Sequence, residues 1–183
     1  MIATASTLLQ RQGYAATGWR QVVNESETPW GSQSHHFPGG KEQLAVEALE
    51  RSGVGYERLL RSAFEAADPV SALRLWVDAA AQQLVATDFA EGCPVATVAL
   101  EMAHTSDAVG DACHRAFAAW QAAISEALLA RGLDAARAGT LATTIVAAIE
   151  GAMLLTRARR DPTPLHDVGS ELVTMLATAL GEG

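Results

Sequence analysis

Cysteine and histidine are the side chains in this sequence with the most capacity for metal or nucleophilic chemistry. Four of them, Cys93, His104, Cys113 and His114, fall in one stretch of the chain. Zinc sites place their ligands at short, recurring intervals, and these four residues do not follow such spacing. Cys113 falls on the apolar stripe of a predicted helix, and Cys93 precedes a proline at a predicted helix start. We therefore expect two reduced, structural cysteines, no metal site and no cofactor.

Enzymatic chemistry has little support in the sequence. No phosphate-binding loop, nucleotide-binding fingerprint or nucleophile elbow occurs. One alternative is an all-helical enzyme that uses His104 or Glu150 in a buried pocket, and turnover that disappeared on replacing His104 would support it. We do not expect the chain to be an enzyme.

The composition is that of a folded, soluble protein. Hydrophobic residues make up 49% and charged residues 19% of the 183 residues. The longest apolar runs are interrupted well before the roughly 20 residues that a membrane span needs, and the first residues lack the basic leader of a secretion signal. These features predict a cytoplasmic protein with no membrane partner.

The net charge of −8 opposes non-specific binding of nucleic acid by the whole surface. The charge is unevenly distributed, because residues 1–51 carry four basic and five acidic side chains, a net of −1. The remaining residues therefore carry −7. An N-terminal DNA-binding unit is compatible with this distribution.

Prolines and apolar spacing together predict an all-helical fold. Apolar residues recur every three or four positions, as a helix with one buried face requires. The clearest stripe runs from Val109 to Leu128, with Ser106 as a predicted N-cap. Each proline falls at a predicted helix start or connection: Pro29, Pro38, Pro69, Pro94, Pro162 and Pro164. Roughly nine helices result, and a continuous helix over residues 41–66 joins an N-terminal domain (1–45) to a larger bundle (46–183).

The first 37 residues have the length and layout of a helix-turn-helix unit. The first predicted helix ends at Gly13-Tyr14, the second begins at Thr17 as N-cap, and a third begins at Pro29 with Thr28 as its cap. In such units the last helix lies in the DNA major groove. The order of these elements predicts DNA binding.

The segment from Pro29 to Leu44 resembles the signature of TetR-type transcriptional regulators. The matching positions are Gly31, His36, Phe37, Lys41 and Leu44. Two further segments look like the branch related to the lincomycin-resistance repressors: residues 35–49, and Gly92-Cys93-Pro94 with the residues that follow. The resemblance to the TetR-type signature covers about 50 residues. The resemblance to the lincomycin-resistance branch extends it weakly over the rest of the chain.

The resemblance implies groove-facing residues in the third helix and phosphate-facing residues around it. The expected DNA-binding residues are Thr17, Thr28, Trp30, Gly31, Ser32, Ser34, His35, His36 and Lys41. Three positions depart from the family pattern: Glu27 replaces a small turn residue, Gln33 a buried leucine, and Ser34 a phosphate-contacting tyrosine. They favour a second alternative, a helical ligand-binding protein with weak or lost DNA binding.

The second domain is expected to bind a small lipophilic or drug-like effector and to form a homodimer on a palindromic operator. Candidate effector-binding residues are Trp76, Phe89, Met102, His104, Phe117, Trp120, Glu150 and Met153. In the family the last two helices of each subunit form the dimer interface. The expected interface residues are Ile145, Ala148, Ile149, Ala152, Leu172, Leu176 and Leu180.

Overall fold

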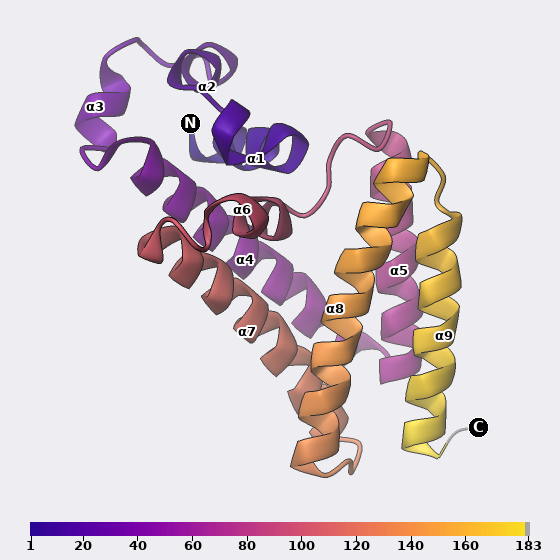
Figure 1. The fold of residues 1–183 in the computed structure, drawn as a ribbon. Coiled ribbons are helices and arrows are strands. Elements are labelled where there is room, and N and C mark those ends of the chain that lie inside the picture. Colours follow the sequence, from indigo (N-terminus) through magenta and orange to yellow (C-terminus); the bar gives the residue numbers. More distant parts are fainter. Residues whose placement is uncertain (182–183) are drawn as a thin grey trace. The chain divides into compact units, whose positions relative to one another are not determined.

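The computed structural model describes residues 1–181, and these residues form nine helices and no strand, in agreement with the predicted all-helical fold (Figure 1). In chain order the helices are α1 (Ile2–Ala16), α2 (Trp19–Glu25), α3 (Ser32–His36), α4 (Gly40–Ala66), α5 (Pro69–Ala86), α6 (Pro94–Met102), α7 (Asp107–Leu129), α8 (Ala135–Arg159) and α9 (Thr163–Leu180). The long helix predicted over residues 41–66 is α4.

Side-chain caps explain several helix starts. Asp68 caps α5 by accepting a hydrogen bond from the Ser71 amide at 2.9 Å, with Pro69 in the first turn, where no amide hydrogen is needed. The Ser106 hydroxyl accepts a hydrogen bond from the Val109 amide at 3.2 Å, which confirms its predicted capping role. Asp134 caps α8 in the same way as Asp68 caps α5.

The helices form two compact units. Unit 1 consists of residues 1–55 and 93–117, and unit 2 of residues 56–92 and the chain from Ala118 onward. Helices α4 and α7 each contribute their first part to unit 1 and the rest to unit 2. The helix-turn-helix segment therefore shares one compact unit with α6, and the functional division at residue 45 remains a prediction.

The core of unit 1 is built from apolar side chains of its short helices and the start of α4. Leu8, Leu9 and Val22 are each 1% exposed. Phe37, at the end of α3, is 5% exposed, and its ring centroid lies 5.8 Å from that of Trp19. Phe37 therefore anchors α3 to the rest of unit 1.

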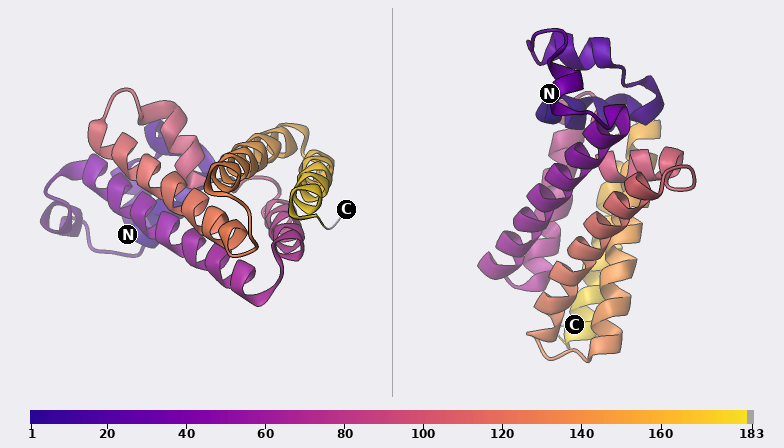
Figure 2. Two further views of the ribbon diagram at one scale, coloured as in Figure 1. Left: turned by 90° about the horizontal axis from the view of Figure 1, so that it is seen from below. Right: turned by 90° about the vertical axis from the view of Figure 1, so that its left-hand side faces the viewer.

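The core of unit 2 is a bundle in which α9 packs against both α5 and α8 (Figure 1; end view in Figure 2, left). Predicted dimer residues Ile145, Ile149, Ala152, Leu172 and Leu176 are at most 5% exposed in this single chain. They fill the subunit's own core because the three helices need an apolar interior, so they leave little area for a partner. Ala148 and Leu180 remain partly exposed.

Helix α8 is long and apolar enough to cross a membrane by length and composition alone, with a mean hydropathy of 1.6 over its most apolar window. From the sequence we expected every apolar run to be too short for a membrane span. That expectation counted the threonines and glycines of this helix as interruptions, although they are only weakly polar. Since its apolar side chains Leu141, Ile145 and Ile149 pack inside unit 2, its hydropathy is that of a core helix.

Candidate nucleic-acid interface

Helix α3 is shorter than the sequence predicts. Its N-cap is Gly31, whose φ of 103° is left-handed, so a helix that starts at Pro29 is wrong. Residues 29–31 instead form a turn, in which the Ser32 hydroxyl donates to the Pro29 carbonyl at 2.7 Å. The recognition element is therefore a turn followed by a five-residue helix.

Gln33 and Ser34 stabilise this turn. The Gln33 side-chain oxygen accepts a hydrogen bond from the Gly31 amide at 2.7 Å, and the Ser34 hydroxyl donates to the Gly31 carbonyl at 2.8 Å. Gln33 thus has a local structural role that its departure from the family's leucine did not reveal. Gln33 and Ser34 therefore stabilise the turn by hydrogen bonds, and they bury no additional apolar surface in the core.

Most of the predicted groove-facing residues are accessible. Trp30 is 66% exposed, which is unusual for so large an apolar side chain. Gly31, Ser34, His35 and His36 are also exposed, and Ser32 is half-buried. All six lie in the turn or in α3, so this short segment is largely exposed.

Thr17 and Thr28 are less available. Thr17 is 3% exposed and its hydroxyl donates to the Gly13 carbonyl at 2.7 Å, so it closes α1 instead of capping α2. The N-cap of α2 is Gly18, without a side-chain hydrogen bond. The hydroxyl of Thr28 pairs with that of Ser26 at 2.8 Å. Both hydroxyls are thus engaged inside the fold.

Lys41, the only lysine in the sequence, lies in the first turn of α4. Its ammonium nitrogen is 4.2 Å from the centroid of the Tyr14 ring and donates a hydrogen bond to the Ala15 carbonyl at 3.4 Å. Partial burial lowers the pKa of Lys41, while the negative charge of Glu101 acts in the opposite direction. Tyr14 is a contact that sequence reasoning missed, although its aromatic character was visible.

Glu27, between α2 and α3, is unfavourable both for the backbone conformation and for phosphate binding. It is exposed and has a φ of 52°, a left-handed conformation that glycine adopts at little cost. Its charge also repels phosphate. This single position combines backbone strain with electrostatic opposition to DNA.

Three aromatic side chains meet in unit 2. The Trp76 indole donates to the Tyr56 hydroxyl at 2.6 Å, and the Tyr56 ring centroid lies 5.0 Å from that of the buried Trp120. Trp76 and Trp120 were predicted to bind an effector, and Tyr56 was not. Its position four residues before the buried Leu60 was the available signal.

The other predicted effector residues are divided between unit 1 and unit 2. Phe89, Glu150 and Met153 are half-buried residues of unit 2. Met102 and Phe117 are half-buried residues of unit 1, and His104 is exposed in the turn after α6. Residues 1–181 contain no group of three His, Cys, Asp or Glu side chains that could hold a metal ion.

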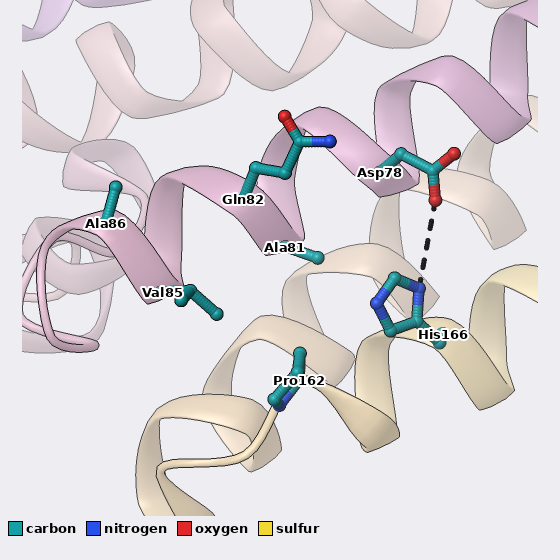
Figure 3. A pocket seen from close by; sticks show the side chains of 7 residues that line it. All are labelled: Asp78, Ala81, Gln82, Val85, Ala86, Pro162 and His166. Atoms are coloured by element: carbon teal, nitrogen blue, oxygen red, sulfur yellow. Dashed lines mark ion pairs between the residues drawn. The ribbon is translucent and has the colours of Figure 1, made fainter.

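A surface pocket of about 360 Å³ lies between α5 and α9 (Figure 3). Asp78 and His166 approach each other at its edge, with 3.8 Å between the carboxylate oxygen and the ring nitrogen. The pocket contains none of the predicted effector residues. Its lining consists of Asp78, Ala81, Gln82, Val85, Ala86, Pro162 and His166.

A different stripe of α8 is open to solvent. These residues lie on one side of the helix, because their spacing follows the helical period. Most are small, and the glycine has no other atom near the position of a Cβ. The stripe comprises Ala136, Thr140, Thr143, Thr144, Ala147, Gly151, Leu154 and Ala158. We call it the α8 stripe.

Comparison with known proteins gives consistent matches over the whole chain. Residues 69–171 match the C-terminal domain of LmrA/YxaF-like transcriptional regulators. The chain is 37% identical to the HTH-type transcriptional regulator YxaF of Bacillus subtilis, covering 96% of this chain and 93% of that protein. It is 34% identical to the HTH-type transcriptional regulator LmrA of the same organism, with coverage of 96% and 94%.

Solved structures share the fold. A regulatory protein TetR from Rhodobacter sphaeroides superimposes with a TM-score of 0.84 at 24% identity, covering 94% of this chain and 95% of that one. A TetR transcriptional regulator from Legionella pneumophila gives 0.85 at 20% identity, with coverage of 95% and 94%. The helix-turn-helix unit, the all-helical fold and these matches together show that the chain belongs to the LmrA/YxaF-like branch of TetR-family transcriptional regulators.

Proposed function

We propose that this regulator is a repressor that binds a palindromic operator as a homodimer and leaves it when a small effector binds. The observation that supports this most is the exposed surface formed by the turn 29–31 and α3, with Lys41 at the start of the next helix. Polar and aromatic side chains suited to base edges and a cation suited to phosphate lie in one short segment. A regulator of this kind acts on DNA in the cytoplasm, so we propose a cytoplasmic location.

The α8 stripe supports the dimer. Small side chains allow another helix to approach closely, and Leu154, 60% exposed, supplies apolar area. A two-fold axis beside α8 would pair the same stripe from two subunits. This assignment replaces most of the interface residues expected from sequence, since those are buried in the subunit itself.

The aromatic group of Tyr56, Trp76 and Trp120 supports an apolar effector site in unit 2. Aromatic walls with a few polar groups suit lipophilic ligands. The effector acts only if it binds the arrangement that is unable to bind DNA more tightly than the competent one. Glu150 and Met153, half-buried in the same unit, are the next residues to test for effector binding.

The test is operator binding by the purified dimer at several salt concentrations, using palindromic DNA from upstream of its own or neighbouring genes. Salt-sensitive, sequence-specific binding is expected. Lys41→Gln should weaken binding to every sequence and lower the slope of log K against log salt by about 1. Arg74→Gln removes one exposed charge of unit 2 and should leave that slope unchanged. A dimer with no salt-sensitive DNA binding contradicts the proposal.

Glu27 favours the second candidate, a ligand-binding protein with weak DNA affinity. Its negative charge repels a nearby phosphate, and its left-handed backbone is strained for a residue other than glycine. This candidate predicts saturable binding of apolar ligands, visible as quenching of the tryptophan fluorescence, and no operator binding at physiological salt.

A further inference from the structure

Helix α1 breaks before its last turn. Gly13 has φ 78° and ψ −175°, outside helical geometry, and only a few residues follow before the helix ends at Ala16. Amides that follow such a break need acceptors from elsewhere in the fold. The carboxylate of Glu101, near the end of α6, accepts from the Tyr14 amide at 3.1 Å and from the Ala15 amide at 2.8 Å.

Gly13 and Glu101 fit each other closely. A Cβ added at Gly13 would lie 1.8 Å from one carboxylate oxygen of Glu101. Such a distance is impossible without moving the carboxylate, and the positive φ independently favours glycine. All of these residues belong to unit 1, in which α6 packs along α1.

Lys41 contacts the same turn of α1. While Glu101 holds the amides of Tyr14 and Ala15, Lys41 donates to the Ala15 carbonyl and lies over the Tyr14 ring. The turn is therefore held by an anion from α6 and a cation from α4. Any displacement of Glu101 removes the acceptors of two amides and releases the surface on which Lys41 rests.

We propose that Glu101 is a positioning residue for DNA binding: through the last turn of α1 it holds Lys41 in the orientation that contacts phosphate. This inference rests on the proposed function, because it assigns to Lys41 the phosphate contact. It gives α6 a specific part in operator binding, although α6 lies about 60 residues beyond the recognition element in the chain.

The sign of the effect separates positioning from simple electrostatics. Removing a negative charge near the DNA-facing surface would by itself raise affinity. If Glu101 positions Lys41, Glu101→Gln instead lowers operator affinity about tenfold, and the salt slope falls toward that of Lys41→Gln. Asp111→Asn removes an exposed carboxylate from the same unit and serves as the charge-matched control, with operator affinity unchanged or slightly raised.

Two local measurements test the contact itself. Glu101→Gln keeps one acceptor oxygen, so hydrogen exchange of at least one of the Tyr14 and Ala15 amides should accelerate in this variant, and exchange of neither in Asp111→Asn. Because the chain has a single lysine, reductive ¹³C-methylation gives one side-chain NMR signal. The pH at which this signal titrates should fall in Glu101→Gln, since the carboxylate favours the charged lysine.

A double-mutant cycle completes the test. Gly13→Ala should destabilise the protein strongly, and less so in the Glu101→Ala background, where only the backbone strain remains. Operator affinity that stays the same or rises in Glu101→Gln, while amide exchange at Tyr14 or Ala15 accelerates, overturns the positioning role alone. A wild-type dimer that binds no operator overturns the proposed function and this inference with it, whereas the amide exchange still reports whether the contact exists.

Discussion

At the scale of single residues, the recognition element relies on backbone hydrogen bonds that polar side chains supply. Gln33 and Ser34 hold both the amide and the carbonyl of Gly31. In a helix this short, few backbone groups can form hydrogen bonds within the helix, so side chains must provide partners for the remaining amides and carbonyls. The two departures from the family pattern thus preserve the shape of the turn while removing an apolar and an aromatic side chain.

Glu27 gives the first prediction. Glu27→Gly removes the left-handed strain and should raise the free energy of unfolding by about 1 kcal/mol. It should also tighten operator binding severalfold, because it removes a negative charge. Glu27→Gln serves as the control: it should reproduce the gain in affinity without the gain in stability. Urea unfolding and salt-dependent DNA binding measure the two effects, and a stability gain in both variants would contradict the strain argument.

Thr156 gives the second prediction. Its hydroxyl is buried, and among the described residues it is the one buried side-chain polar atom without a hydrogen-bond partner. An unpartnered buried hydroxyl destabilises the fold, so Thr156→Val should raise the free energy of unfolding by about 1 kcal/mol.

The control for Thr156 lies on the same helix. The hydroxyl of Thr140 is exposed and donates to the Ala136 carbonyl at 2.9 Å. Thr140→Val should therefore change stability little. Denaturant unfolding at one fixed protein concentration compares the two variants. A loss of stability in Thr156→Val would show that the hydroxyl has a partner, such as a water molecule.

At the scale of elements, a carboxylate caps the start of two helices, α5 and α8. The hydrogen bond from the Ser71 amide lowers the pKa of Asp68, the N-cap of α5. A carboxyl whose pKa is lowered on folding stabilises the fold above its unfolded pKa of about 4, and this stabilisation is lost as the pH falls through the folded value.

Replacing Asp68 gives the third prediction. Asp68→Ala should cost about 1 kcal/mol at pH 7, and the difference from wild type should shrink as the pH falls below about 4. Asp68→Ser retains a capping oxygen without the charge, so it should recover most of the loss and show less pH dependence. Urea unfolding across this pH range measures the effect. A cost that stays constant with pH would contradict the role of the carboxylate.

At the scale of the whole molecule, assembly depends on which apolar area remains after each subunit has filled its own core. In the dimer proposed above, helix α8 serves both purposes. Its side toward α9 is buried, and the α8 stripe remains open. The subunit stability and the dimer stability should therefore respond to different residues of the same helix.

Two leucines of nearly equal exposure provide the fourth prediction. Leu154 on the α8 stripe is 60% exposed and Leu75 on α5 is 59% exposed. Leu154→Lys should raise the dimer dissociation constant by at least tenfold, because a two-fold interface would bury the charge from both subunits. Leu75→Lys should leave it unchanged. Sedimentation over a range of concentrations distinguishes them, and equal effects would place the interface elsewhere.

Local sequence rules predicted most of the helices. Prolines, caps such as Asp68 and Ser106, and three- or four-residue apolar spacing act over one or two helical turns, so they are readable without the fold. The family signature from Gly31 to Leu44 likewise lies in one short segment. Together these signals determined the helical class, the helix-turn-helix unit and the regulator family.

Tertiary structure decided what those helices contact. The period of α8 marks its apolar positions, but only packing against α9 shows that Ile145 and Ile149 belong to the subunit core and Gly151 to the open side. The left-handed backbone at Gly31, which shortens α3, is different, because the hydrogen bonds that support it come from Gln33 and Ser34 within three residues. The contact of Glu101 with α1 joins residues far apart in the sequence, and no local rule encodes such a pair, because its energy depends on how two helices approach each other.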